Sequence, residues 1–374
     1  MKKMFGLLLA LVMLVSTAAS LADDSITLTY AEVNPIEGTI VGELAAAFKT
    51  KLEELSGGTI LVDLQGGGVL GDEKTVLANI LGGDTSVDIV RISAFALNQY
   101  GAVKSVFLTL PYVFTSEDHY WNFVTSDLAK EMLAESKEVG LPFNGLAYGE
   151  EGFRHFFSKV DIKTLDDLKG LKIRVSDDPI MTGMIKGLGA AFTPVSFGEL
   201  YTSLQTGVVD AAEQPITNYL SNSFQEVAPY MLKDGHTLGT IELIATDNAL
   251  NKLTDEQKAM VQEAADYAMQ VCKDSVTLKQ EEAQQTLIDS GCTVTEVEDK
   301  TPWQEATKDL LAQNIAGMED VSVAYNLDGG DSAYLIINGK KMRTSTVTTS
   351  PAVSKSSSPT IFPKNTPPII QQSR

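Results

Sequence analysis

The sequence has few of the residues on which most metal, cofactor and covalent-catalysis sites depend. Its 374 residues include two cysteines, three histidines and two tryptophans. The histidines His119, His155 and His236 lack metal-ligand spacing, and no HExxH, GxSxG or P-loop motif occurs. We therefore predict no metal site, no cofactor and no nucleophile–base pair, and we interpret His155, in "HFF", as a packed strand residue.

The two cysteines, Cys272 and Cys292, are not expected to form a disulfide. Cys272 lies within a long helical pattern, and Cys292 follows the end of that pattern. The intervening helix would separate them by roughly 24 Å at ~1.5 Å per residue, whereas bridged Cα atoms lie about 4.4–6.8 Å apart. We predict two buried free thiols.

Positive charge is scarce: 29 basic residues stand against 49 acidic ones, and the formal net charge is −20. Nucleic-acid binding needs a basic surface and is therefore not expected. An anionic ligand would also meet a repulsive far field, so an anion site must be built from local cations.

Long hydrophobic runs are confined to the N-terminus. Lys2 and Lys3 precede the apolar stretch "MFGLLLALVMLV", and small residues follow in "STAASLA". This pattern is typical of a signal peptide, residues 1–22, cleaved after Ala22. No cysteine lies beside the cleavage site, and no later apolar run reaches about 18 residues. We expect an exported protein of the periplasm that does not insert into a membrane.

Apolar residues recur in alternating strand and helix patterns, which predicts an α/β protein with a parallel-type sheet covered by helices. A chain of 374 residues suits two domains. Strands are predicted at 25–33, 59–64 and 87–93, and helices at 40–55, 72–81 and 94–100. After an interruption at 142–157, strands are predicted at 171–175, 190–195 and 208–214, and helices at 165–170, 179–188 and 197–206.

Two capping-box patterns mark helix starts: Thr164 with Asp167, and Thr254 with Gln257. The second opens a helix that runs to about Ser290. Such a helix would be roughly 52 Å long at the standard rise, which is longer than one lobe needs. We predict that it crosses two lobes.

Two arginines, Arg154 in "EEGFRHFF" and Arg174 in "GLKIRVSDDP", are placed near strand ends that flank the change of register between the two rhythms of strands and helices. A guanidinium binds a carboxylate through two parallel hydrogen bonds and stays charged when partly buried. The pattern alone leaves two alternatives open for each arginine, a solvated surface residue or an anion-binding residue. Asp210 and Glu213 precede Pro215 at the expected mouth of a strand, where ligands of open sheets bind.

Several blocks together resemble the extracytoplasmic solute-binding proteins of tripartite ATP-independent periplasmic (TRAP) transporters, the family of the C4-dicarboxylate-binding protein. They are "GFRHFF", "IKTLDDLKGLKIRV", "PVSFGELYTSLQTGVVDAAEQP" and "SNSFQEVAPY", with "VLGDEKTVLANILGGDTSVDIVRIS", "FLTLPYVF" and "NKLTDEQKAMVQEAA" in the same order. The resemblance extends from about Thr27 to about Gln313. It implies a two-lobed α/β periplasmic-binding-protein fold, with hinge strands and a long helix spanning both lobes, that closes on its ligand.

The resemblance also implies the binding residues. Arg174 would pair with the ligand carboxylate and Arg154 would assist it, and Gln214 stands where the family usually has asparagine. The expected ligand-binding set is Arg174, Arg154, Gln214, Glu73, Phe197, Asn34, Tyr148 and Glu213. An arginine pair leaves monocarboxylates, dicarboxylates, keto acids and sugar acids open.

These inferences predict a monomeric, non-enzymatic binding protein that delivers a small carboxylate to integral-membrane TRAP transporter subunits. Two alternatives are a receptor of an ATP-driven importer, and a secreted α/β enzyme that uses Glu73, Asp210 or Glu213 in acid–base chemistry. The expected organisation is residues 23–149 plus 240–277 for lobe I, 150–239 plus 278–320 for lobe II, and an atypical, largely disordered tail at 321–374. The tail holds six basic residues and no acidic one after Asp331, and truncation near Gly339 is expected to leave folding and binding intact.

Overall fold

The computed structural model describes residues 25–316 except residue 103, together with 321–324, 334–337 and 340–343. The chain comprises two compact units, Met1–Leu310 and Leu311–Arg374. The predicted signal peptide and the segment from Thr344 onward lie outside the described residues.

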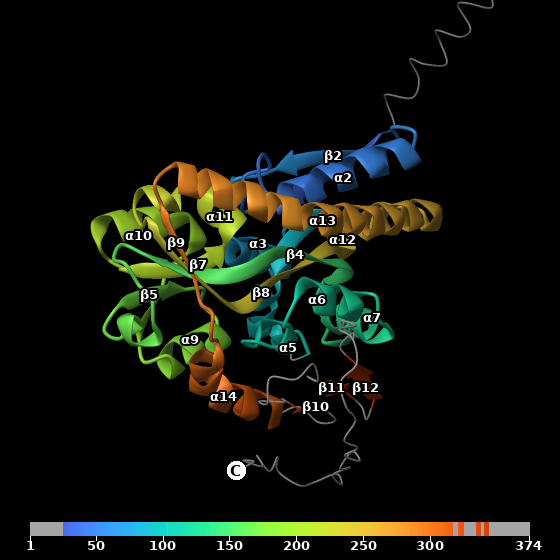
Figure 1. The fold of residues 1–374 in the computed structure, drawn as a ribbon. Helices are drawn as coiled ribbons and strands as arrows, with labels where there is room; N and C mark the ends of the chain where they lie inside the picture. The colour runs from blue at the N-terminus through green and yellow to red at the C-terminus, as the bar shows by residue number, and fades with distance from the viewer. Residues whose placement is uncertain (1–24, 103, 317–320, 325–333, 338–339, 344–374) are drawn as a thin grey trace, which may run out of the picture. The chain divides into compact units, whose positions relative to one another are not determined.

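One mixed sheet of nine strands organises the first unit, in the order β2-β1-β3-β8-β4-β7-β5-β6 with β9 beside β8 (Figure 1). Pairs within β1–β3 and within β5–β7 are parallel, as predicted, but β4 and β8 pair with their neighbours β3 and β7, and with each other, in antiparallel fashion. The strands are β1 (Ile26–Ala31), β2 (Ile60–Gln65), β3 (Ile89–Ser93), β4 (Phe143–Ser158), β5 (Lys172–Val175), β6 (Ala191–Pro194), β7 (Ala211–Pro215), β8 (Tyr230–Thr246) and β9 (Thr293–Glu296).

Helices connect these strands, and most predicted helices are confirmed within one or two residues. Both capping boxes are present, at Thr164–Asp167 and Thr254–Gln257. The helices are α2 (Ile40–Leu55), α3 (Glu73–Leu81), α4 (Ala94–Leu97), α5 (Val106–Thr109), α6 (Glu117–Val124), α7 (Asp127–Leu133), α8 (Glu135–Glu138), α9 (Pro179–Gly187), α10 (Leu200–Thr206), α11 (Ile216–Ser221), α12 (Asp247–Asn251), α13 (Asp255–Asp289) and α14 (Thr301–Ala316), with 3-10 turns at η1 (Asn98–Tyr100), η2 (Leu165–Leu168), η3 (Phe197–Glu199) and η4 (Phe224–Glu226).

The interruption at 142–157 is one continuous strand rather than a break. β4 has 16 residues and β8 has 17, and almost all of them are buried. The start of β4 and the end of β8 pair beside β3, whereas the end of β4 and the start of β8 pair beside β7 and β9. The two strands therefore join two halves of the sheet. Arg154 lies well inside β4, so its predicted place near a strand end is wrong.

A bulge marks the point where β4 passes between the halves. The register between β4 and β8 shifts between Glu150 and Phe153. Gly152 in this bulge has φ of 89°, a left-handed conformation that L side chains rarely adopt. Gly239 faces it so closely that a Cβ atom would lie 2.9 Å from the carbonyl oxygen of Gly152. The local change in pattern that the sequence shows thus corresponds to a bulge, not to a chain break.

Helix α13 extends over both halves, as predicted, and is one uninterrupted 35-residue helix (Figure 1). It packs on α2 and β4, and further along on α11 and β9. Each half has its own apolar core: Val76, Leu77 and Phe143 belong to one, and Ile173, Met184 and Trp303 belong to the other.

Both cysteines are free thiols, as predicted. Cys272 is buried in α13, whereas Cys292 is only partly buried, so the expectation of two buried thiols holds for one of them. The Cys272 sulfur donates to the Glu150 carbonyl oxygen at 3.3 Å, which ties the helix to the bulged strand.

The second unit contains three strands that the sequence patterns did not predict. β10 (Val321–Ala324), β11 (Tyr334–Ile337) and β12 (Lys340–Arg343) form an antiparallel sheet. A truncation near Gly339 would remove β12 from β11.

We therefore expect that a chain ending at Ala316, rather than at Gly339, keeps the fold of the first unit. Within the described residues, β10–β12 pair only with one another. The truncated protein should melt within about 2 °C of the full chain in a thermal scan. A larger fall would show that the removed segment stabilises the first unit.

Candidate functional site

Arg174 is a buried cation without an acidic hydrogen-bond partner. It lies on β5 and is 2% exposed. Its Nε donates to the carbonyl oxygen of Val195 at 2.9 Å, and its guanidinium lies 6.0 Å from the ring centroid of Phe197. Its Nη1 has no hydrogen-bond partner among the described residues. Burial lowers the pKa of Arg174 to about 10, so the group is still charged at neutral pH but short of an acceptor. The solvated alternative for Arg174 is thereby excluded.

Arg154 is equally buried but already paired. Its Nη2 lies 2.9 Å from Glu213 Oε1, and its Nε donates to Glu213 Oε2. The guanidinium also lies 5.2 Å from the ring centroid of Phe95. Although burial opposes ionisation, Arg154 and His236 hold the pKa of Glu213 at about 2. Arg154 thus has little positive charge to spare, and Glu213, a predicted ligand contact, serves it as a counterion.

Glu213 belongs to a longer chain of charges. His236 Nε2 lies 3.5 Å from Glu213 Oε2, and His236 Nδ1 lies 2.7 Å from Asp234 Oδ2. Burial opposes protonation of this imidazole, but Asp234 and Glu213 outweigh it and raise the pKa of His236 to about 9. His236 is therefore a buried imidazolium held between two carboxylates.

This arrangement predicts a dependence of stability on pH. The raised pKa of His236 contributes stability that is complete below about pH 6.5 and is lost as the pH rises through 9, by up to about 3 kcal/mol. The lowered pKa of Glu213 contributes stability that is complete above about pH 4.5 and is lost as the pH falls toward 2. Urea unfolding between pH 5.5 and 9 should show the alkaline decline.

The His236→Gln variant isolates this contribution. It should be less stable than the wild-type protein at pH 6, and the difference should shrink by pH 9, because the wild-type imidazole is then losing its proton. A difference in unfolding free energy that stays constant across this range would contradict the assignment.

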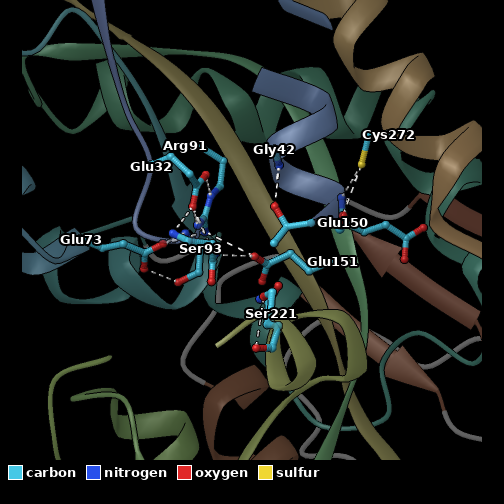
Figure 2. Close-up of polar contacts among 12 residues, drawn as sticks. Glu32, Gly42, Glu73, Arg91, Ser93, Glu150, Glu151, Ser221 and Cys272 are labelled. Atoms are coloured by element: carbon cyan, nitrogen blue, oxygen red, sulfur yellow. Dashed lines mark hydrogen bonds and ion pairs between the residues drawn. The ribbon is translucent and has the colours of Figure 1, made fainter. Parts of the chain in front are cut away.

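A second arginine cluster surrounds Arg91 on β3 (Figure 2). Arg91 Nε donates to Glu32 Oε2 at 2.7 Å, Nη2 donates to Glu32 Oε1, and Nη1 donates to Glu73 Oε1 at 2.8 Å. Glu151 Oε1 lies 3.6 Å from Nη1. Glu151 and its neighbour Glu150 point in opposite directions along β4, with Glu151 turned toward Arg91. Three carboxylates thus share one guanidinium.

Glu73 and Asn34, two predicted ligand contacts, belong to this cluster. Glu73 accepts hydrogen bonds from Arg91 and from the Ser93 nitrogen and hydroxyl, each at 2.8 Å. Asn34 donates to Glu32 at 3.1 Å and accepts from Asn222 at 3.4 Å. Both side chains are therefore held in place by protein partners.

The remaining predicted ligand contacts, Phe197, Gln214 and Tyr148, do not lie together. Phe197 is half-buried beside Arg174. Gln214 is 4% exposed, and strand alternation places it on the opposite face of β7 from Glu213. Tyr148 is buried with its ring 6.1 Å from that of Phe123, and burial and nearby Glu242 raise its pKa. The contacts of Tyr148 are thus with an aromatic core rather than with the arginines.

The acid–base alternative finds no support in these contacts. Glu213 is ionised and paired, and Glu73 is held by Arg91 and Ser93. Asp210 Oδ2 accepts from the backbone nitrogen of Lys172 at 3.0 Å, at the start of β7 rather than at its Pro215 end. His155 is a packed residue of β4 whose Nδ1 accepts from the Gly235 nitrogen at 3.0 Å, as its sequence context predicted.

Sequence reasoning missed Arg91, Glu32, Glu151, Asp234 and His236 as members of these clusters. Arg91 carried a usable signal, because "IVRIS" places an arginine inside an apolar strand, as "KIRV" does. Asp234 and His236 lie in β8, which no strand prediction covered. Among the described residues, no group of three or more His, Cys, Asp or Glu could hold a metal ion.

Contacts across the two halves lie near Arg174. Asn98, after α4, donates to Asp178 Oδ2 at 2.9 Å, and Lys74, in α3, contacts Asp177 at 2.6 Å. Both aspartates follow β5. The two halves therefore meet at the end of the strand that carries Arg174, so the guanidinium lies between them and away from water.

A two-halved sheet crossed by two long strands and one long helix, with a buried arginine between the halves, defines a two-lobed α/β ligand-binding protein. Comparison with known sequences gives the family. The profile described as "Bacterial extracellular solute-binding protein, family 7" matches residues 31–317. The chain belongs to this family, which confirms the resemblance drawn from its motifs.

Individual relatives agree with this placement. "Uncharacterized protein YiiZ" of Salmonella typhimurium is 31% identical over 262 residues, covering 70% of this chain and 79% of the relative. A TRAP periplasmic solute-binding protein of Bradyrhizobium, solved with galacturonate, is 30% identical with a TM-score of 0.74, covering 78% and 96%. Another, from Pseudomonas putida, solved with D-glucuronate, is 28% identical with a TM-score of 0.73, covering 78% and 94%. In the described part of the chain, no helix is both long and apolar enough to cross a membrane.

Proposed function

We propose that this protein captures a small carboxylate of the sugar-acid class and delivers it, unchanged, to the membrane subunits of a TRAP transporter. The observation that carries the proposal is the buried guanidinium of Arg174, whose Nη1 lacks an acceptor. A ligand carboxylate between the halves would supply that acceptor. The uronates bound by the similar Bradyrhizobium and Pseudomonas putida proteins support sugar acids as the ligand class.

The proposal includes a location and an organisation. A signal peptide at 1–22 would direct the chain to the periplasm. Lobe I would comprise 23–149 plus 240–277, and lobe II 150–239 plus 278–320, because β4 and β8 change partners near Glu150 and Thr240. The protein would act as a monomer, and Arg174, Arg154, Phe197, Gln214 and Glu73 would face the ligand.

A thermal-shift series tests the function. D-Galacturonate and D-glucuronate should raise the melting temperature, by about 5–10 °C at 100 times the dissociation constant. The matched controls are D-galactose and D-glucose, which lack the carboxylate and should leave the melting temperature unchanged. NMR of the recovered acid should show no conversion. Equal shifts with acids and neutral sugars would contradict the role of Arg174, and converted acid would indicate an enzyme.

A further inference from the structure

Negative charges outnumber positive charges around Arg174, and this excess limits the charge that a ligand can carry. Three buried guanidiniums, of Arg91, Arg154 and Arg174, all lie within electrostatic range of the Glu73 carboxylate. The carboxylates that partner or act on these guanidiniums are those of Glu32, Glu73, Glu151, Glu213 and Asp72. This set has two more carboxylates than guanidiniums before any anionic ligand binds.

The pairing within the set leaves a single position for an anion. Arg91 is shared by Glu32, Glu73 and Glu151, and Arg154 is bridged by Glu213. Among these three arginines, only Arg174 has no carboxylate within salt-bridge distance in the described part of the chain; its Nε donates to the Val195 carbonyl and its Nη1 has no partner there. One ligand carboxylate would complete its hydrogen bonds.

A second carboxylate on the same ligand would be unfavourable. Glu73 and Asp72 stand at the start of α3, which lies beside the end of β5 because Lys74 contacts Asp177 there at 2.6 Å, and both carboxylates act electrostatically on Arg174. A ligand that extends from Arg174 toward α3 would therefore meet negative charge. Like charges brought together away from water repel strongly. Hydroxyl groups, by contrast, could donate hydrogen bonds to these carboxylates.

From this balance, which rests on the proposed function, we infer that the site selects sugar acids with one carboxylate and excludes the corresponding dicarboxylates. The buried, unpaired fork of Arg174 fixes the acid end, and the acidic residues at the start of α3 require the other end to be uncharged.

Three hexose acids test the inference by titration calorimetry: galactonate, galacturonate and galactarate. Galactarate is the open-chain meso diacid with the hydroxyl configuration of both mono-acids; it differs from galactonate only in its second carboxylate, whereas galacturonate closes to a pyranose ring. Galactonate should bind about 100-fold or more tightly than galactarate. Equal or tighter binding of galactarate would overturn the inference and leave the proposed function intact, whereas failure of all three acids to bind would overturn both.

The Glu73→Gln variant tests whether the charge of Glu73 causes the discrimination against the diacid. Removing this charge should narrow the ratio between mono-acid and diacid to about tenfold or less, because galactarate gains affinity. The matched variant Glu138→Gln removes an exposed acidic charge whose contact is Lys104 and should leave the ratio unchanged. An unaltered ratio in folded Glu73→Gln protein would show that the discrimination arises elsewhere, and Asp72→Asn, which preserves the helix cap, is the second test.

Discussion

Arg174→Ala should abolish useful ligand binding. Truncating one partner of a buried charge pair costs roughly 2–5 kcal/mol, which is about a 30- to 4,000-fold loss of affinity. The loss is expected to be large because the guanidinium is 2% exposed and its Nη1 has no protein acceptor, so the ligand carboxylate would have no other compensating charge. Calorimetry with the tightest-binding acid measures it. Lys172→Ala, at the exposed start of the same strand, is the matched control.

A second substitution at this position, Arg174→Met, should separate the effect on ligand binding from the effect on stability. A buried cation without a counterion stabilises no fold, and burial disfavours its charged form. Arg174→Met, which fills a similar volume, should therefore melt at the wild-type temperature or above it when no ligand is present. Undiminished affinity in Arg174→Ala, or a severe loss of stability in Arg174→Met, would assign this residue a structural role instead.

Arg91→Ala should be the most destabilising of the substitutions considered. It would leave the buried carboxylates of Glu32 and Glu151, and the partly buried one of Glu73, around an absent guanidinium whose side chain is 1% exposed in the native protein. Removing one partner of a buried ion pair costs about 3–5 kcal/mol, which corresponds to a fall of about 10 °C in melting temperature. Thermal and urea unfolding at pH 7 measure the loss.

A control variant tests whether the burial of the ion pair, rather than ion pairing itself, causes the loss of stability in Arg91→Ala. Lys104 pairs with Glu138 at 2.7 Å, but both side chains are about half exposed. Lys104→Ala should therefore cost less than about 1 kcal/mol. Arg91→Lys keeps the charge but loses the planar fork, so its loss of stability should lie between those of Arg91→Ala and Lys104→Ala. An Arg91→Ala protein as stable as Lys104→Ala would mean that the carboxylates around Arg91 are protonated or solvated.

The fold was predictable where hydrophobic period and helix caps agree. Helices α2 and α13 and strands β1 and β5 follow from apolar spacing and from cap residues such as Thr254. Strand β8 was not predictable in this way, because both its faces are buried and its polar residues, among them Asp234 and Glu242, are buried as well. A strand with two buried faces has no alternation to recognise.

The site was predictable residue by residue only in part. The strand pattern marked Arg174 as a candidate and the family resemblance assigned it to the ligand, but nothing local distinguishes it from Arg154, whose counterion lies 59 positions away in Glu213. Whether a buried charge is compensated depends on residues that the fold brings together, and a sequence pattern does not report such partners. Glu73, in helix α3, illustrates the same limit, since its partners Arg91 and Ser93 lie on strand β3.

The paired strands β4 and β8 also determine when this chain can fold. Phe143 pairs with Thr246, and Ile89 with Ala245, so neither half of the sheet is complete until residues from the last third of the described chain have arrived. Pairings between distant positions slow the search for the native state. The sheet should therefore form only once β8 has been synthesised, in one cooperative step. An expressed fragment that ends before β8 should remain an unfolded, protease-sensitive polypeptide rather than a stable subdomain.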